Sequence, residues 1–149
     1  MFYKFLLRIG LSPKKSLTLN QIKVPNQYFI DFLRGVIDGD GSIYTWKHPS
    51  NGNIQWSLRI FSGSKNFLNW LKEDIEELLE SQGRLYITKK INSNPLYQLK
   101  FGKFATKAIF SKCYYADCLS LQRKHLMALQ CLKAEDKLSK YGVHNAQVV

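Results

Sequence analysis

The sequence predicts an α+β domain built on one antiparallel four-stranded sheet, with its elements in the order α-β-β-α-β-β-α-α. Three observations support this fold class. Apolar residues recur at helical spacing in residues 26–37 and 64–83, while apolar and polar residues alternate along 54–62. Short turn signals at 49–52 and 92–95 separate neighbouring strand patterns. Turns this short join antiparallel strands, so each one predicts a hairpin.

Length and composition indicate a single globular domain with a polyanionic partner. The 149 residues are 45% hydrophobic and 13% aromatic, which excludes a disordered chain. Lysine and arginine total 22 against 11 acidic residues, a net charge of +11, so nucleic acid is the simplest partner. No stretch reaches the roughly 20 apolar residues of a membrane span, and the apolar opening is too short for a signal peptide. We therefore expect an intracellular protein of the cytoplasm or an organellar matrix, neither secreted nor membrane-bound.

The cysteines and histidines do not predict a metal site. Cys113, Cys118 and Cys131 are odd in number and form no C-x-x-C pair, which favours buried free thiols in a reducing compartment. The three histidines are scattered along the sequence, so a histidine cluster is not supported.

The chain divides into an entry segment, a main domain and a tail. Residues 1–25, which contain Pro13 and Pro25, predict a short helix followed by an irregular stretch. The main domain spans 26–139, and residues 140–149 show no clear pattern.

The first helix of the main domain begins near Asn26, a plausible N-cap after Pro25, and runs to about Ile37. Ser64 is expected to cap the second helix, which ends at Gly83. The remaining predicted elements are strands at 42–48, 54–62, 84–90 and 96–101 and helices at 103–115 and 121–138.

Alternation along the strands predicts two different sheet faces. If Leu58, Ile60, Leu85 and Ile87 face the core, the opposite face is basic, aromatic and rich in hydroxyl groups. An ordinary solvated face is the alternative for any one strand, but solvated faces rarely combine tryptophan with tyrosine. Because a two-stranded ribbon fits the major groove, this face is predicted to bind DNA. The predicted DNA-binding residues are Ser42, Tyr44, Trp46, His48, Gln55, Ser57, Arg59, Phe61, Arg84, Tyr86, Thr88 and Lys90.

The most informative segment is FLRGVIDGDGSIY, residues 32–44, in which an apolar helix runs into aspartates alternating with glycines. Carboxylates at this density suit a hard divalent cation. A helix C-cap is one alternative, although acidic residues at a helix C-terminus oppose the helix dipole. A calcium loop is the other, but Ile43 and Pro49 replace its required glycine and glutamate.

Residues 33–41 resemble the signature of the LAGLIDADG homing endonuclease family. The signature residues present are Leu33, Gly35, Ile37, Asp38, Asp40 and Gly41, and the departures are Arg34, Val36 and Gly39. The resemblance extends over about residues 24–138 and implies the family fold, with a saddle-shaped sheet lying along DNA. It also implies hydrolysis of phosphodiester bonds with Mg²⁺ or Mn²⁺.

The same resemblance assigns roles within the site. It implies that Asp40 is the metal ligand, assisted by the carbonyl group of Gly39, and that Asp38 positions the turn. The expected basic residue is Lys124, in an L-x-R-K element at 121–124, with Lys103 as the second candidate. Ser64 would lie near the attacking water, with a helix cap as the alternative role.

A single signature implies that two copies pair. Leu33, Gly35, Val36 and Gly39 are the expected interface of a homodimer, whose double-stranded DNA target would be close to palindromic. The opening residues also resemble the tail of a preceding module, so the alternative partner is a different half.

Together these features predict a sequence-specific double-strand DNA endonuclease with no small-molecule substrate. The first alternative is a non-cleaving protein of the same fold, either an RNA-splicing maturase or a DNA-binding regulator. The second is a basic module for ribosome or membrane attachment, which leaves the DGDG element unexplained.

Overall fold

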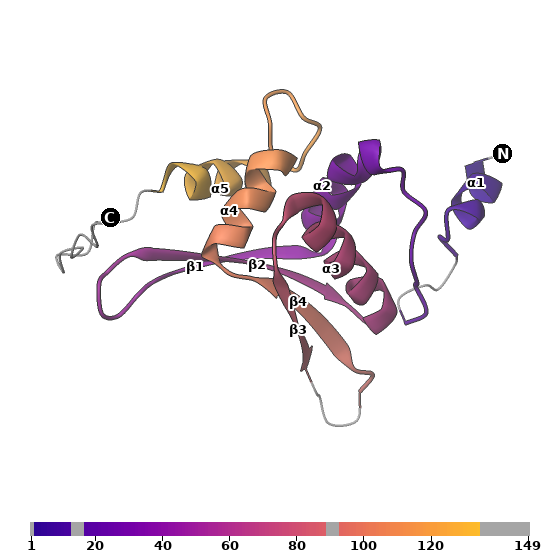
Figure 1. Ribbon diagram of the computed structural model, residues 1–149, viewed down its shortest axis with the longest axis horizontal. Helices are drawn as coiled ribbons and strands as arrows, with labels where there is room; N and C mark the ends of the chain where they lie inside the picture. The colour runs from indigo at the N-terminus through magenta and orange to yellow at the C-terminus, as the bar shows by residue number, and fades with distance from the viewer. Residues whose placement is uncertain (1, 13–16, 89–92, 135–149) are drawn as a thin grey trace, which may run out of the picture.

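One four-stranded antiparallel sheet organises the molecule, and the helices of the main domain lie on one face of it (Figure 1). The structure, a computed structural model, describes residues 2–12, 17–88 and 93–134. The strand order is β1-β2-β4-β3, so the two hairpins are joined by pairing between β2 and β4. The predicted α+β class and its antiparallel sheet are confirmed.

The elements follow the predicted order, with one short 3₁₀ turn added. They are α1 (Phe2–Arg8), η1 (Asn26–Tyr28), α2 (Phe29–Asp40), β1 (Gly41–Lys47), β2 (Ile54–Ser62), α3 (Lys65–Leu79), β3 (Gly83–Thr88), β4 (Leu96–Phe101), α4 (Lys103–Cys113) and α5 (Gln122–Lys133). The predicted end of the third strand at Lys90, and of the last helix at 138, lie outside the described residues. Among the residues that are described, no helix has the length and apolar content needed to cross a bilayer.

The predicted limits of the first main-domain helix were wrong at both ends. Asn26 is not its N-cap, because it begins the 3₁₀ turn, and α2 starts at Phe29 without a side-chain cap. The helix also continues beyond Ile37 to Asp40, so both aspartates of the DGDG element are helical.

The second helix was predicted correctly at its start and wrongly at its end. The hydroxyl of Ser64 accepts a hydrogen bond from the Phe67 amide, as an N-cap should. The helix ends at Leu79, where Glu80 takes a left-handed conformation with φ 51°. Gly83 instead begins β3, where an added Cβ would lie 2.7 Å from the ring of Phe101.

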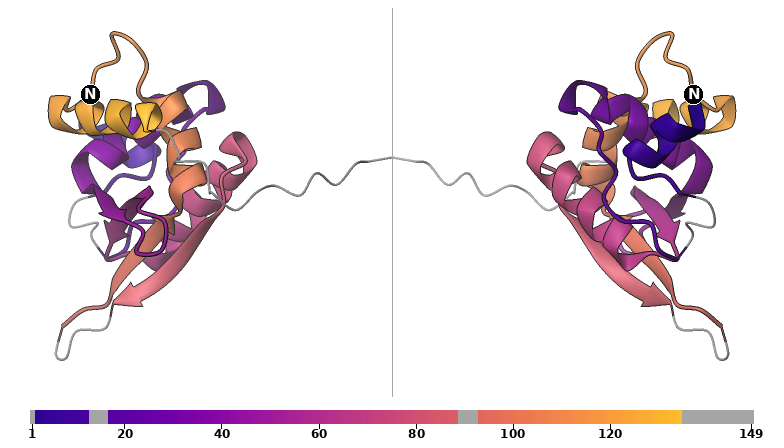
Figure 2. Two further views of the ribbon diagram at one scale, coloured as in Figure 1. Left: turned by 90° about the vertical axis from the view of Figure 1, so that its left-hand side faces the viewer. Right: turned by 90° about the vertical axis from the view of Figure 1, so that its right-hand side faces the viewer.

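The core lies between the sheet and the helices above it. Its largest fully buried side chains are Phe29, Leu33 and Ile37 of α2, Leu58 and Ile60 of β2, Leu68, Leu71 and Ile75 of α3, Leu99 and Phe101 of β4, and Ile109 and Phe110 of α4. Ile87, predicted to be buried with them, is 52% exposed. It lies near the end of the β3–β4 hairpin, which extends beyond the helices (Figure 2).

Part of the predicted entry segment belongs to this core. Helix α1 ends at Arg8, and the φ of +95° at Gly10 then permits Leu11 to donate to the Leu6 carbonyl at 2.9 Å. The chain then returns to the main domain, where Ile22 is only 3% exposed and Leu19 packs against the core cluster.

Helix α2 passes directly into β1 without a loop. At Gly41 the backbone turns to φ −80° and ψ 149°, while its amide still bonds to the Ile37 carbonyl. An added Cβ on Gly41 would lie 2.6 Å from the Ile37 oxygen and 2.9 Å from the Ile37 Cα. Both are backbone atoms of the last helical turn and cannot give way as a flexible side chain would. The junction therefore requires glycine at position 41.

We predict that Gly41→Ala destabilises the fold by about 2 kcal/mol, because the new methyl group overlaps the last turn of α2. Urea denaturation measures this change. The control is Gly35→Ala in the same helix, where an added Cβ meets no atom within 4 Å. In the single chain, where no atom lies against this position, that variant should gain about 0.5–1 kcal/mol through its better helix propensity. Equal effects of the two substitutions would contradict the steric account.

Candidate functional site

Strand register places the predicted DNA-binding positions of β1, β2 and β3 on the face opposite the helices. Arg59 of β2 pairs with Lys100 of β4, and Lys100 pairs with Arg84 of β3. Because directly paired residues share a face, these three form a row of cations across neighbouring strands. We call this surface the open face; its described members are Ser42, Tyr44, Trp46, Gln55, Arg59, Phe61, Arg84, Tyr86, Thr88, Leu96, Gln98 and Lys100.

Aromatic rings lie among these cations. Tyr44, Trp46 and Tyr86 are 41%, 45% and 43% exposed, which is unusually high for large rings in a sheet. The guanidinium of Arg59 lies over the Tyr44 ring, 3.8 Å from its centroid. This cation–π contact holds the partly exposed arginine on the open face.

Sequence reasoning missed the β4 members of this face, which are Leu96 and two polar residues, Gln98 and Lys100. Both are on β4, where they alternate with Leu99 and Phe101, which face the core. The sequence of β4 carries the signal that identifies them, because polar and apolar residues alternate along 98–101. Lys100 is the centre of the cation row, since it pairs with both Arg59 and Arg84.

Ser57 was wrongly included among the DNA-binding residues. It is fully buried, and its hydroxyl donates to the Phe101 carbonyl at 2.9 Å. His48 lies beyond the end of β1, in the turn, with its Nδ1 atom 2.9 Å from the hydroxyl of Ser50. Lys90 lies outside the described residues.

The two aspartates of the DGDG element have different surroundings. Asp38 accepts a hydrogen bond from the Tyr114 hydroxyl at 2.7 Å and another from the Leu121 amide at 2.8 Å. Burial, reinforced by the bond to Asp38, raises the pKa of Tyr114. Asp38 therefore joins α2 to the connection between α4 and α5. Asp40, the last residue of α2, is exposed.

Lys124 lies at this acidic helix end. Its Nζ donates to the carbonyl groups of Ile37 and Gly41, and the residue is only 3% exposed. Burial is the main cause that lowers its pKa, with a smaller effect from Arg123, while Asp38 and Asp40 act in the opposite direction.

The second predicted lysine lies in a different setting. Lys103 begins α4 and is partly exposed. Burial first, and then the charge of Lys107, lower its pKa, while Cys131 of α5 raises it. These neighbours belong to the α4–α5 pair.

Ser64 was wrongly proposed to lie near an attacking water. It is 3% exposed, its Oγ accepts from the Phe67 amide at 3.3 Å, and its hydroxyl donates to the Leu19 carbonyl. Both functions of the hydroxyl are used within the fold. The alternative role of helix cap is confirmed.

The donor set at Asp40 suits a divalent ion that keeps most of its waters better than an ion enclosed by protein ligands. The described part of the chain contains no group of three or more His, Cys, Asp or Glu side chains that could hold a metal. The chain offers the Asp40 carboxylate and, from the last helical turn, the carbonyl group of Gly39. Mg²⁺ commonly keeps several waters and binds one or two carboxylates together with substrate phosphates. These residues fit an ion of that kind.

The outer side of α2 borders an apolar groove of about 810 Å³. Its lining includes Phe32, Gly35, Val36 and Asp40 of this helix. An added Cβ at Gly35 or at Gly39 would meet no atom within 4 Å. Another backbone could therefore approach this side of the helix closely.

Leu33, predicted to be part of a dimer interface, does not lie on this surface. It is fully buried in the core of its own chain, so it has no surface to offer a partner. The helical stripe of apolar residues is divided: Leu33 and Ile37 face inward, while Phe32 and Val36 line the groove.

Comparison with known proteins gives a likeness in structure only. No family model and no curated protein sequence matches the chain. One similar solved structure is the homing endonuclease I-CvuI in complex with its target (Sro1.3) in the presence of Ca, at 19% identity and a TM-score of 0.49. Another is I-CvuI with the I-CreI target (C1221) in the presence of Mg, at 17% identity and a TM-score of 0.47. Each match covers 73% of this chain and 69% of the other. With TM-scores below 0.5, neither likeness establishes a family.

We predict that Asp38→Ala destabilises the protein by about 2 kcal/mol, because it leaves the buried Tyr114 hydroxyl without its acceptor. Tyr114→Phe should cost about 1 kcal/mol. The loss in the double variant should be smaller than the sum of the two single losses, since both substitutions remove the Tyr114–Asp38 bond and only Asp38→Ala also removes the bond from the Leu121 amide. Urea denaturation of all three variants measures the coupling. The control is Glu77→Ala, an exposed carboxylate of α3, expected to change stability by less than about 0.5 kcal/mol. Full additivity would exclude the bond.

Proposed function

We propose that this protein is a sequence-specific double-strand DNA endonuclease of the LAGLIDADG type, a homing endonuclease that uses Mg²⁺ or Mn²⁺ and acts as a homodimer. The observation that carries this proposal is the place of Asp40 relative to the open face. The chain runs from Asp40 through Gly41 to Ser42, the first open-face residue of β1. A metal-binding carboxylate thus stands at the margin of a basic surface suited to DNA.

Charge distribution supports DNA as the ligand of the open face. Residues 73–80 hold five of the chain's 11 acidic side chains, and they belong to α3 and its end, on the helical side of the sheet. The open face instead carries Arg59, Lys100 and Arg84. Because the two kinds of charge lie on opposite sides of the sheet, the open face is the side that would attract a polyanion. Arginine and lysine there can bind phosphates or guanine edges, and strands of this kind can enter the major groove.

The proposed chemistry assigns separate tasks to the residues of the site. Asp40, with the Gly39 carbonyl, would hold the divalent ion, which when bound activates water and stabilises charge on the phosphate. The cations of the open face would hold the DNA so that a phosphate reaches Asp40. Lys103 and Lys124 are the two lysines that the resemblance implies for the site.

Pairing of two copies would complete the site. The groove side of α2, with Gly35 and Gly39 open, suits close packing against the same helix of a second copy. Two Asp40 carboxylates would then lie near one another, each serving one strand of a near-palindromic target. The alternative partner, a preceding half of different sequence, would use the same helix side.

A non-cleaving nucleic-acid-binding protein, a maturase or a regulator, would share the open face. The contrast between the two aspartates favours cleavage. Asp38 is explained by its bonds to Tyr114 and Leu121, whereas Asp40 presents its carboxylate to solvent. A protein that only binds nucleic acid has no need of that second carboxylate.

We predict that Asp40→Asn abolishes plasmid cleavage in Mg²⁺, by at least about 100-fold, and leaves binding of target DNA in Ca²⁺ within about threefold. The amide retains the shape of the side chain but loses the charge that holds a cation. Supercoiled plasmid carrying the target is the substrate, with EDTA as the metal-free control and Glu77→Gln as the control for charge. Persistent cutting by Asp40→Asn would contradict the assignment of Asp40 as the metal ligand. Parent protein that produces only nicked circles would argue against paired sites.

We predict that Lys100→Ala weakens binding of duplex DNA and lowers the slope of log Kd against log salt by about one. The lost ammonium group would no longer displace a counterion from a phosphate. Lys112→Ala, which removes an exposed lysine from α4 on the helical side, is the matched control and should leave the slope unchanged. Fluorescence anisotropy at several salt concentrations makes the comparison. Equal losses in the two variants would show that net charge, and not the open face, determines binding.

A further inference from the structure

We propose that Lys124 and Arg34 are positioning residues of the Asp40 site. Lys124 stabilises the junction between α2 and β1, where Asp40 lies. Arg34 stabilises the α4–α5 connection, which positions Lys124 at that junction. This inference rests on the proposed function for its consequence, but its geometry stands on the fold alone.

Lys124 bonds to the backbone on both sides of Asp40. Its ammonium group donates to the carbonyl oxygen of Ile37, three residues before Asp40, and to that of Gly41, the residue after it. The first carbonyl belongs to the last turn of α2 and the second to the first residue of β1. One side chain therefore ties the end of the helix to the start of the strand.

The position of the lysine suits this role better than a direct one in the reaction. At 3% exposure, the residue offers almost no surface to water or to a phosphate. Two of the three N–H groups of its ammonium are already used by carbonyl groups. A positive charge at the C-terminus of α2 also offsets the unfavourable placement of two aspartates at the negative end of the helix dipole.

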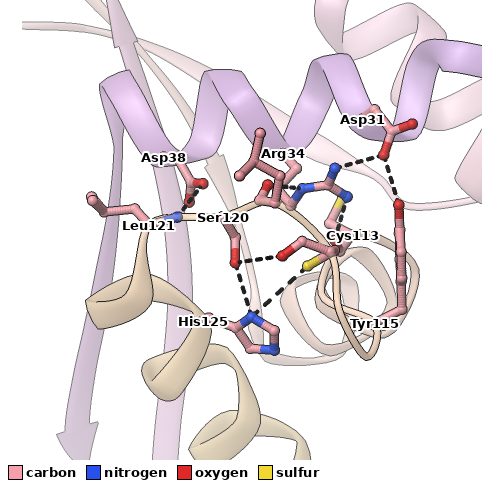
Figure 3. A network of polar contacts seen from close by, with 10 residues as sticks. Asp31, Arg34, Asp38, Cys113, Tyr115, Ser120, Leu121 and His125 are labelled. Carbon is pink, nitrogen blue, oxygen red and sulfur yellow. Dashed lines mark hydrogen bonds and ion pairs between the residues drawn. The ribbon is translucent and has the colours of Figure 1, made fainter.

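Arg34 binds the connection between α4 and α5, which leads to Lys124, and Figure 3 shows the contacts of the arginine. Its Nε donates to the Leu119 carbonyl at 2.9 Å, and its Nη1 donates to the Cys113 carbonyl at 3.0 Å. Its Nη2 bonds to Asp31 at 2.6 Å, one turn earlier in α2, and Tyr115 donates to the same carboxylate oxygen at 3.0 Å. The Arg34 side chain is only 7% exposed. A buried guanidinium thus binds both the end of α4 and the loop that follows it.

A second contact between α2 and the α4–α5 connection lies one helical turn further along α2. Asp38, four residues after Arg34, accepts a hydrogen bond from the amide of Leu121, which lies at the N-terminus of α5. Within the connection, the Ser120 hydroxyl lies 2.9 Å from Nδ1 of His125 (Figure 3). Lys124 follows in the first turn of α5. The connection is therefore anchored at two points of α2 before the lysine returns to the end of that same helix.

The test compares Lys124→Met and Arg34→Lys with Arg123→Met, a matched control that removes an exposed cation next to Lys124. Methionine keeps the length of the buried chain without the donors, and lysine at position 34 keeps the charge without the planar fork. The first measurement is amide hydrogen exchange at Gly41 in the full-length protein without metal or DNA. The second is plasmid cleavage as a function of Mg²⁺ concentration.

We expect Gly41 exchange to rise about tenfold in Lys124→Met, more modestly in Arg34→Lys, and by less than about twofold in Arg123→Met. The Mg²⁺ concentration for half-maximal cleavage should rise about tenfold or more in Lys124→Met. Lys124 would not bind the metal itself, but a residue that orients a metal ligand such as Asp40 affects the affinity for the metal. Saturating Mg²⁺ should restore the rate to within about threefold of the parent.

A rate loss of about 100-fold in Lys124→Met that Mg²⁺ does not restore would overturn the proposal, since it would place the lysine in the chemical step. Unchanged Gly41 exchange in both variants would also overturn it. If Lys124→Met fails to fold, Arg34→Lys decides the question, because it keeps the charge and leaves Lys124 itself unchanged. If the parent does not cleave DNA, the proposed function fails, and the exchange measurement still decides the positioning role.

Discussion

A buried ammonium group holds the point at which α2 becomes β1, and the site depends on that point. Burying a lysine is unfavourable unless its charge is compensated. Here the compensation comes from the carbonyl groups of Ile37 and Gly41, with Asp38 and Asp40 nearby. The same contacts relieve a helix end that would otherwise combine unpaired carbonyl groups with two carboxylates. Helix α2, strand β1 and helix α5 thus stabilise one another at the junction that Lys124 contacts.

The division of labour between the two aspartates follows from this arrangement. Asp38 points toward the α4–α5 connection and is occupied by Tyr114 and Leu121. Asp40, two residues later, stands on another side of the helix, where it borders the groove and is exposed. A spacing of two residues turns a helical side chain through about 200°. The alternation with glycine therefore yields one structural and one accessible carboxylate from positions two residues apart.

Local pattern was sufficient to predict the order of elements, because strand alternation and short turns are properties of neighbouring residues. The same logic assigned Arg59, Tyr44 and Arg84 to one face, which the register confirms. It failed where the outcome depends on distant contacts. Ser57 has the right alternation but is buried through its bond to Phe101, and Ile87 has the right alternation but lies beyond the helices that would cover it.

The candidate site shows the same limit. The DGDG element could be recognised from its sequence, and Lys124 was expected near it through a family resemblance. The burial of that lysine and the bonds of Arg34 to Leu119 and Cys113, 85 and 79 residues away, could not be derived from spacing. Helix ends were also misplaced, since α2 continues to Asp40 through contacts that lie outside the segment itself.

Because no loop separates α2 from β1, the strand and the Asp40 carboxylate are directly connected and should move together. Asp40 and the open-face residue Ser42 are separated by a single glycine whose conformation is fixed by contact with Ile37. Under the proposed function, a base pair that fits β1 poorly would tilt the strand and displace the carboxylate by a comparable amount. Recognition of sequence would then be transmitted to the cutting step mechanically, without a separate switch.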